Sequence, residues 1–327
     1  MKNTLTELLG ISYPIIGGAM YPCSNPELVA AVSEAGGIGI VQPLSLVYVY
    51  GYEFRAGLRK IRSLTNKPIG MNMIVEKSAR IYEERMNAWM QIALEEGVRF
   101  FITALGNPAA VVKAVHAQGG VVFHDVTEKR WALKALAAGV DGLVCVNDRA
   151  GGHLGTQSPE HLFSELSSLG VPLVCAGGIG ASADFARAIN LGYVGVQIGT
   201  RFIATVECSA HDSYKQAIVN ANATDIVVTD RVTGVPLSVI NTPYLERSGA
   251  RAGKLARILL KNPRTRHFMR FMYSLISVWK LKKSVLKGLS TKDFWQAGKS
   301  VDGVKEILPV GNIVNEFMQA LDPNPAQ

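Results

Sequence analysis

Short glycine-rich segments follow apolar stretches in the second half of the chain, and their residue types suit the binding of an anion. One is Ala176-Gly177-Gly178-Ile179-Gly180, and another is Gln197-Ile198-Gly199-Thr200. Glycine lets the backbone approach an anion closely, and free N–H groups at the start of a helix can bind phosphate. We therefore expect Gly178, Gly199 and Thr200 to form one phosphate cradle. The alternative for each segment alone is an ordinary tight turn.

A third glycine-rich segment, residues 147–155, carries one histidine, His153. Imidazole can act as a base, an acid or a hydrogen-bond donor near neutral pH. The alternative is a surface-loop histidine without a chemical role. We favour a catalytic role, because glycines flank His153 and the loop would lie beside the phosphate cradle.

Eight apolar segments rich in Val and Ile alternate with longer amphipathic stretches. They span residues 14–20, 37–42, 68–75, 100–105, 121–126, 142–147, 172–178 and 195–202. Nearly continuous apolar character is typical of parallel strands that are buried on both faces. The first amphipathic stretch begins at Asn25-Pro26-Glu27, a typical helix start. Six glycines are placed to end helices in the left-handed conformation before a strand begins: Gly36, Gly97, Gly119, Gly139, Gly170 and Gly192.

Repeated strand–helix units predict an α/β fold, the (β/α)8 TIM barrel, which binds ligands at the C-terminal ends of its strands. The rival is a doubly wound open sheet, which normally has a GxGxxG motif after its first strand. The first strand here ends in Gly17-Gly18-Ala19-Met20 instead. We expect the barrel to span residues 1–205, a basic, mostly helical capping domain to span 206–290, and residues 291–327 to return to the barrel.

Positive charge is concentrated in the expected capping domain. Residues 247–292 hold thirteen of the 34 Lys and Arg residues and no Asp or Glu. Basic amphipathic helices at 251–290 could bind a membrane surface, an acidic partner such as an acyl carrier protein, or an anionic substrate. We favour the alternative, a cap whose apolar face closes the pocket. Nucleic acid is not an expected partner, because no nucleic-acid-binding fold accompanies the charge.

Several other classes of protein find no support in the sequence. No stretch reaches the roughly 18 apolar residues of a membrane-spanning helix. Residues 1–9 lack the apolar core of a signal peptide. The four cysteines form no CxxC pair, which argues against a disulfide framework or a metal site. We expect a cytoplasmic protein without a metal ion, with Cys145 and Cys175 in the core.

Taken in order, four segments resemble the nitronate monooxygenase family, formerly called 2-nitropropane dioxygenases. They are PIIGGAM at 14–20, NDRAGGHLG at 147–155, CAGGIG at 175–180 and QIGTRF at 197–202. The resemblance extends from Tyr13 to about residue 315. The family also includes FMN-dependent enoyl-ACP reductases and NADH:quinone reductases. It implies an FMN-dependent barrel enzyme with a smaller helical domain over the site.

The resemblance implies positions for the flavin. Gly18, Ala19 and Met20 would lie against the ring, and Asn72 would bond its polar edge. The segment from Trp295 to Gly298 would pack beside the ring. One position departs from the family, which often has Gln where this chain has Lys299. A lysine there could stabilise an anionic reduced flavin, or it could point to solvent.

At the other end of the cofactor, the resemblance implies that Gly178, Gly199 and Thr200 hold the phosphate, and His153 matches the active-site histidine. His124 and Asp125 form a second polar pair at a strand end. We expect His124 to contact the ribityl chain or the phosphate, with simple barrel packing as the alternative. The remaining expected cofactor contacts lie in the same loops: Ala150, Gly151, Gly177 and Gln197.

The implied activity is FMN-dependent oxidation of alkyl nitronates by O2 to a carbonyl compound and nitrite, with His153 positioning the nitro group or removing a proton. The alternative is an NAD(P)H-dependent FMN reductase that acts on a quinone or an enoyl thioester. A third interpretation is a flavin-binding or membrane-associated protein without turnover. The expected partners are a small-molecule substrate and O2, joined by NAD(P)H in the alternative. The sequence does not indicate an oligomeric state.

Overall fold

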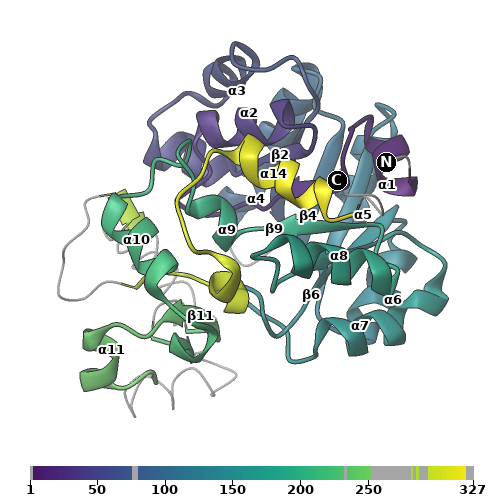
Figure 1. Cartoon of the computed structure of the whole chain (residues 1–327). Helices are drawn as coiled ribbons and strands as arrows, with labels where there is room; N and C mark the ends of the chain where they lie inside the picture. The colour runs from purple at the N-terminus through teal and green to yellow at the C-terminus, as the bar shows by residue number, and fades with distance from the viewer. Residues whose placement is uncertain are drawn as a thin grey trace.

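The computed structural model describes residues 3–75, 80–231, 234–251, 281–282, 285–286 and 294–321. At its centre is a closed barrel of eight parallel strands (Figure 1). The strands are β1 (Ile15–Gly17), β2 (Ile38–Val41), β3 (Ile69–Val75), β4 (Phe100–Leu105), β5 (Val121–Val126), β6 (Gly142–Val146), β8 (Leu173–Ala176) and β9 (Gly195–Ile198). Each lies inside one of the predicted apolar segments, and pairing of Ile16 with Gln197 closes the barrel. The predicted (β/α)8 barrel is therefore confirmed.

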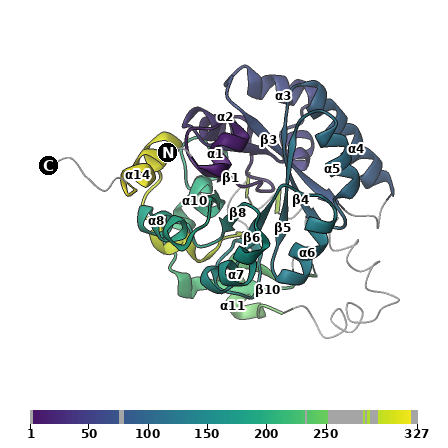
Figure 2. The ribbon, with the colours of Figure 1, turned by 90° about the vertical axis from the view of Figure 1, so that its right-hand side faces the viewer.

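Helices surround the strands (Figure 2). They are α2 (Pro26–Glu34), α3 (Phe54–Arg62), α4 (Arg80–Glu95), α5 (Ala109–His116), α6 (Lys129–Ala137), α7 (Pro159–Leu166) and α8 (Ser182–Leu191). The six glycines predicted to end helices all have positive φ, between 66° and 111°. Glycine adopts this left-handed backbone without strain, which confirms that prediction. No helix in the described part of the chain is long and apolar enough to cross a membrane.

The start of α2 differs in one detail from the prediction. Asn25 occupies the N-cap position, but its side chain makes no capping hydrogen bond. Its amide instead donates to Glu27 Oε2 and to the Glu207 carbonyl, and its oxygen accepts from the Ser209 N–H. Asn25 thus joins the loop after the first strand to the segment that follows the last one.

Two layers of apolar side chains form the core, one inside the barrel and one between the strands and the helices. The inner layer contains Ile16, Ile38, Ile40, Phe100, Ile102, Phe123, Val144, Val174 and Ala176. Helix α1 (Thr4–Leu9) adds Leu5 and Leu9 to this layer from the N-terminal ends of the strands. Cys145 and Cys175 are buried free thiols in the outer layer, as predicted. Side chains alternate along a strand, so residues two positions beyond the inner layer also face the barrel axis.

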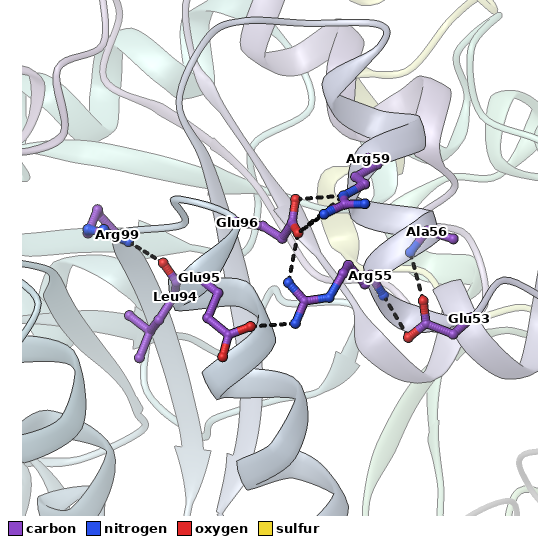
Figure 3. A network of polar contacts seen from close by, with 8 residues as sticks. All are labelled: Glu53, Arg55, Ala56, Arg59, Leu94, Glu95, Glu96 and Arg99. Atoms are coloured by element: carbon purple, nitrogen blue, oxygen red, sulfur yellow. Dashed lines mark hydrogen bonds and ion pairs between the residues drawn. The ribbon is translucent and has the colours of Figure 1, made fainter.

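Polar contacts join α3 and α4 on the outside of the barrel (Figure 3). Arg55 pairs with Glu95 and, at 2.8 Å, with Glu96, which Arg59 also reaches at 2.9 Å. The Glu53 carboxylate caps α3 by accepting hydrogen bonds from two backbone N–H groups. Solvent screens such surface pairs, so we expect them to orient the two helices more than to stabilise the fold.

After β9 the chain forms a second, smaller group of elements (Figure 1). They are α9 (Thr200–Ile203), α10 (Asp212–Asn220), β10 (Ile226–Thr229), β11 (Leu237–Ile240) and α11 (Pro243–Ser248). Strand β11 pairs antiparallel with β10 and also with β7 (Gly152–His153), which carries the predicted catalytic histidine. The sequence pattern predicts no strand here, because β10 and β11 are only four residues long and lie among polar residues. Most of the predicted basic helices of 251–290 lie outside the described residues.

The last part of the chain returns to the barrel. Gln296 forms a bridge with Val239 of β11, and η4 (Lys299–Gly303) follows. Helix α14 (Val310–Gln319) packs against α2 and α8 (Figure 1). There the Phe185 and Phe317 rings stack with their centroids 5.6 Å apart. Helix α14 thus takes the place of the helix that normally follows the last strand of such a barrel.

Gly39 on β2 and Gly311 in α14 form a matched pair for testing how helices pack on the barrel. A Cβ at Gly39 would lie 2.0 Å from the Val29 carbonyl oxygen of α2, whereas nothing lies within 4 Å of a Cβ at Gly311. We expect Gly39→Ala to lower the free energy of unfolding by about 1–3 kcal/mol, because α2 must move away from the strand. Gly311→Ala should raise it by about 0.5–1 kcal/mol, since alanine favours a helix. Denaturant unfolding followed by circular dichroism measures both, and equal effects would contradict this packing.

Candidate functional site

A cradle of backbone N–H groups lies at the ends of β8 and β9. Ala176 pairs with Gln197, so the glycine-rich loops that begin at Gly177 and Gly199 start from the ends of neighbouring strands. Among the described residues, the N–H groups of Gly178, Gly199 and Thr200 donate no hydrogen bond to the protein. Buried N–H groups normally have a partner. The cradle therefore fits an anionic group, such as the phosphate that the sequence predicts there.

The two residues just before α8 donate to the protein itself. Oδ2 of Asp184 accepts hydrogen bonds from the N–H groups of Gly180 and Ala181, at 3.1 and 3.0 Å. A carboxylate at a helix N-terminus also offsets the positive end of the helix dipole. These two N–H groups are therefore not available to a ligand in the cradle.

Asn147 fixes the loop that leads to the predicted histidine. Its amide donates to the Gly177 carbonyl at 3.0 Å, and its oxygen accepts from the Arg149 N–H at 2.9 Å. Gly177 has a φ of 116°, and a Cβ there would lie 2.4 Å from the same oxygen and 2.6 Å from Ala150 N. Only glycine fits this position.

Three segments that are far apart in the sequence meet beside the cradle. The Gly298 N–H donates to Thr200 Oγ1 at 3.0 Å. A Cβ at Gly151 would lie 3.0 Å from that oxygen and 2.8 Å from Gly298 N. The structure thus brings together seven of the predicted cofactor contacts: Ala150, Gly151, Gly177, Gly178, Gly199, Thr200 and Gly298.

The residues after β1 lie next to the cradle. The Gly18 N–H donates to the Ile198 carbonyl at 2.8 Å, which places Gly18 beside Gln197. A Cβ at Gly199 would lie 3.7 Å from Met20 Sδ. Ala19 packs against the inner apolar layer. The three residues predicted to lie against a flavin ring therefore line the top of the barrel beside the predicted phosphate site.

Buried polar atoms without a partner also occur at predicted cofactor contacts. Among the described residues, Gln197 Oε1 and Trp295 Nε1 have no hydrogen-bond partner. The Trp295 ring is held by stacking on Tyr214, with centroids 5.8 Å apart. Asn72 faces the barrel axis and donates to the Ile102 carbonyl only at 3.3 Å. A flavin ring system offers both donors and acceptors, so these residues fit its polar edge.

His153 lies on β7, opposite Leu237 of β11. Although its side chain has surface open to solvent, the protein around it disfavours the imidazolium cation and lowers its pKa below the usual 6.5. The imidazole is therefore neutral at pH 7, able to accept a proton and to donate one hydrogen bond. Because Gly151 lies against Thr200, the histidine is held close to the cradle.

His124 occupies the outer face of β5. Its strand neighbours Val122 and Val126 belong to the outer apolar layer, and alternation places His124 with them. Nδ1 lies 2.7 Å from Thr103 Oγ1, whose hydroxyl donates to the Phe123 carbonyl at 3.1 Å. Burial lowers the pKa of His124 to about 4. This arrangement supports barrel packing, the alternative to a cofactor contact.

The neighbouring Asp125 faces the barrel axis, two positions beyond Phe123 of the inner layer. Its Oδ1 is buried and has no partner among the described residues. Burial raises the pKa of this carboxyl to about 7, so near neutral pH it can act as a protonated hydrogen-bond donor. Of the polar pair at this strand end, alternation along β5 places Asp125 on the inner face of the barrel and His124 on the outer face.

Lys299 joins the end of the chain to the loop after β6. Its Nζ lies 3.7 Å from Asp148 Oδ2, and 39% of its side chain is exposed. Its backbone N–H donates to the Arg149 carbonyl at 3.0 Å. In this arrangement the lysine charge is partly offset by a loop carboxylate.

Sequence and structure comparisons place the chain among known enzymes. The profile of the nitronate monooxygenase family matches residues 2–320. The chain is 30% identical over 260 residues to a (3aS,4S,5R,7aS)-5-hydroxy-7a-methyl-1-oxo-octahydro-1H-indene-4-carboxyl-CoA dehydrogenase of Rhodococcus jostii, covering 78% of this chain and 71% of that protein. It is also 30% identical over 277 residues to a nitronate monooxygenase of Pseudomonas aeruginosa, covering 72% and 78%. Among solved structures, FabK from Thermotoga maritima has a TM-score of 0.80 and 29% identity, over 98% of this chain and 96% of that one.

Asp125→Asn tests the burial of a carboxyl inside the barrel. The folded-state pKa of about 7 lies above the ordinary 3.8, so the wild-type chain loses stability as the pH rises through this interval. Asparagine cannot ionise, and we expect the stability of the variant relative to wild type to grow with pH, by up to about 4 kcal/mol. Urea unfolding at about pH 4 and pH 8 measures the change. A stability difference that is the same at both pH values would contradict the assignment.

Proposed function

The chain belongs to the nitronate monooxygenase family, a family of flavin-dependent oxidoreductases, and on this premise we propose that its cofactor is FMN. The observation that carries the proposal is the cradle of Gly178, Gly199 and Thr200, whose N–H groups lack protein partners among the described residues. A single terminal phosphate, as in FMN, matches one compact cradle. Buried Gln197 Oε1 and Trp295 Nε1 supply an acceptor and a donor for the ring.

We further propose that the substrate is an alkyl nitronate, which O2 oxidises to a carbonyl compound and nitrite. The family profile and the relative from Pseudomonas aeruginosa support this reaction. Bound FMN would supply the redox chemistry by accepting electrons from the substrate and delivering them to O2. His153, which is neutral at pH 7, would hold the nitro group by a hydrogen bond or remove a proton from a neutral nitroalkane. Residues 206–290 would close the site as a cap.

A second candidate is an NAD(P)H-dependent reductase of a thioester substrate. The thioester substrate is supported by the relative from Rhodococcus jostii, whose name is that of a carboxyl-CoA dehydrogenase. Residues 247–292 hold thirteen Lys and Arg and no Asp or Glu. This positive charge also suits a polyanionic substrate such as a coenzyme A ester. The two candidates share the cofactor and differ in the electron donor.

Two measurements on the purified, FMN-loaded protein separate the candidates. A monooxygenase should release nitrite from propionate-3-nitronate in air, and NADH or NADPH should not bleach its flavin without oxygen. A reductase should show rapid anaerobic bleaching by one of the two nucleotides and no nitrite release. Nitrite release that needs NAD(P)H would contradict the first proposal, and absence of both reactions would contradict both.

His153→Gln tests the role of the histidine, because glutamine can form a hydrogen bond but cannot accept a proton at neutral pH. With 2-nitropropane, which must lose a proton, we expect kcat/KM to fall by about 100- to 10,000-fold. With the preformed nitronate the loss should be smaller, about tenfold or less, since only one hydrogen bond changes. Steady-state oxygen consumption measures both. Equal losses with the two substrates would show that His153 is not the base.

A further inference from the structure

Four cationic side chains of the described residues lie beside the phosphate cradle or in the pocket at Gly178, and the protein itself engages two of them. The Arg201 guanidinium is buried and donates to the carbonyls of Ala204 and Glu306, at 3.1 and 3.0 Å. Lys299 pairs with Asp148. Within the described part of the chain, the guanidinium of Arg149 forms no ion pair and no hydrogen bond. Arg187 lines the pocket from an exposed position on α8, so the half-buried Arg149 guanidinium is the less hydrated of the two cations available to a ligand.

Arg149 is held directly over the glycine pair at the end of β8. A Cβ at Gly178 would lie 2.7 Å from Arg149 Nε and 2.9 Å from its Cδ, so the absence of a side chain at Gly178 makes room for the arginine. The backbone of Arg149 is fixed on both sides, because its N–H donates to Asn147 Oδ1 and its carbonyl accepts from the Lys299 N–H. The side chain is half-buried, and it lines a pocket of about 130 Å³ together with Gly177 and Gly178.

The acidic residues in this pocket do not neutralise the guanidinium. Asp148 lies 3.7 Å from Lys299 Nζ, and Asp184 accepts the N–H groups at the start of α8. Glu160 is exposed on the first turn of α7. Because the Asp184 carboxylate lies at the start of α8 and offsets its dipole, this helix supplies less positive charge to a bound phosphate than an uncapped helix would. A dianionic group at Gly178 therefore needs a positive charge from elsewhere.

We propose that Arg149 binds the phosphate of the cofactor and makes the site selective for a phosphorylated flavin. The assignment rests on the proposed FMN cofactor. A guanidinium presents a planar set of donors that matches phosphate geometry, and hydrogen bonds between charged groups are stronger than those between neutral groups. The backbone N–H groups then fix the position of the phosphate, and Arg149 supplies the positive charge that balances it.

The test compares FMN with riboflavin, which has the same ring and ribityl chain but no phosphate. Dissociation constants for both are measured by flavin fluorescence on the apoprotein of the wild-type chain and its variants. Arg149→Ala should weaken FMN binding by about 10- to 100-fold and change riboflavin binding by less than about twofold. Arg149→Lys, which keeps a charge but not the planar donors, should lie between wild type and Arg149→Ala. Arg59→Ala is the matched control, since Arg59 is an exposed arginine of α3 on the outside of the barrel and should leave both constants unchanged.

Each outcome decides the assignment. Equal losses for FMN and riboflavin would mean that Arg149 only shapes the loop, and unchanged FMN binding would mean that it does not touch the phosphate; either result overturns the proposal. Added salt should weaken FMN binding to wild type more than to Arg149→Ala, because an exposed charge pair is screened. A wild-type chain that binds neither flavin would instead overturn the proposed cofactor, and the role of Arg149 with it.

Discussion

Close backbone contact between the loop after β6 and the segment around Gly298 holds the candidate site together. A Cβ at Gly298 would lie 2.4 Å from the Arg149 carbonyl, and one at Gly180 would lie 1.9 Å from the Ser300 carbonyl. No larger side chain can enter such contacts without moving the backbone. Segments about 150 residues apart in the sequence are therefore in contact, and the loop after β6 and the returning chain meet beside the strand ends.

The surrounding protein also sets the charge of the groups near this contact. It lowers the pKa of His153, and burial raises the pKa of Asp125. Both shifts favour the neutral form, since a charged group loses hydration in a protein interior. These two side chains therefore make the barrel mouth polar while carrying less charge near neutral pH than exposed groups would.

The sequence predicted the barrel well because buried parallel strands and helix-ending glycines leave strong local signals. It placed the cradle residues together for the same reason, since neighbouring strands end at one edge. It could not show that Asp184 accepts the N–H groups of α8, or that Arg201 is engaged by two carbonyls, because these depend on side-chain geometry. Strands β10 and β11 were missed because a strand of four residues leaves little periodic pattern. The alternation of apolar residues along β5 is enough, in principle, to predict that Asp125 faces the barrel axis and His124 the outer layer.

The antiparallel pairing of β7 with β11 limits the insertions and deletions that this architecture can accept during evolution. His153 sits on a strand of two residues whose register is set by Leu237 and Ser238 of the following segment. A slip of one residue would turn the imidazole to the opposite face of that small sheet. The segment that would shape substrate preference and the residue that would perform proton transfer are therefore inherited as one unit. Insertions and deletions between residues 206 and 290 should be tolerated only where they keep this register.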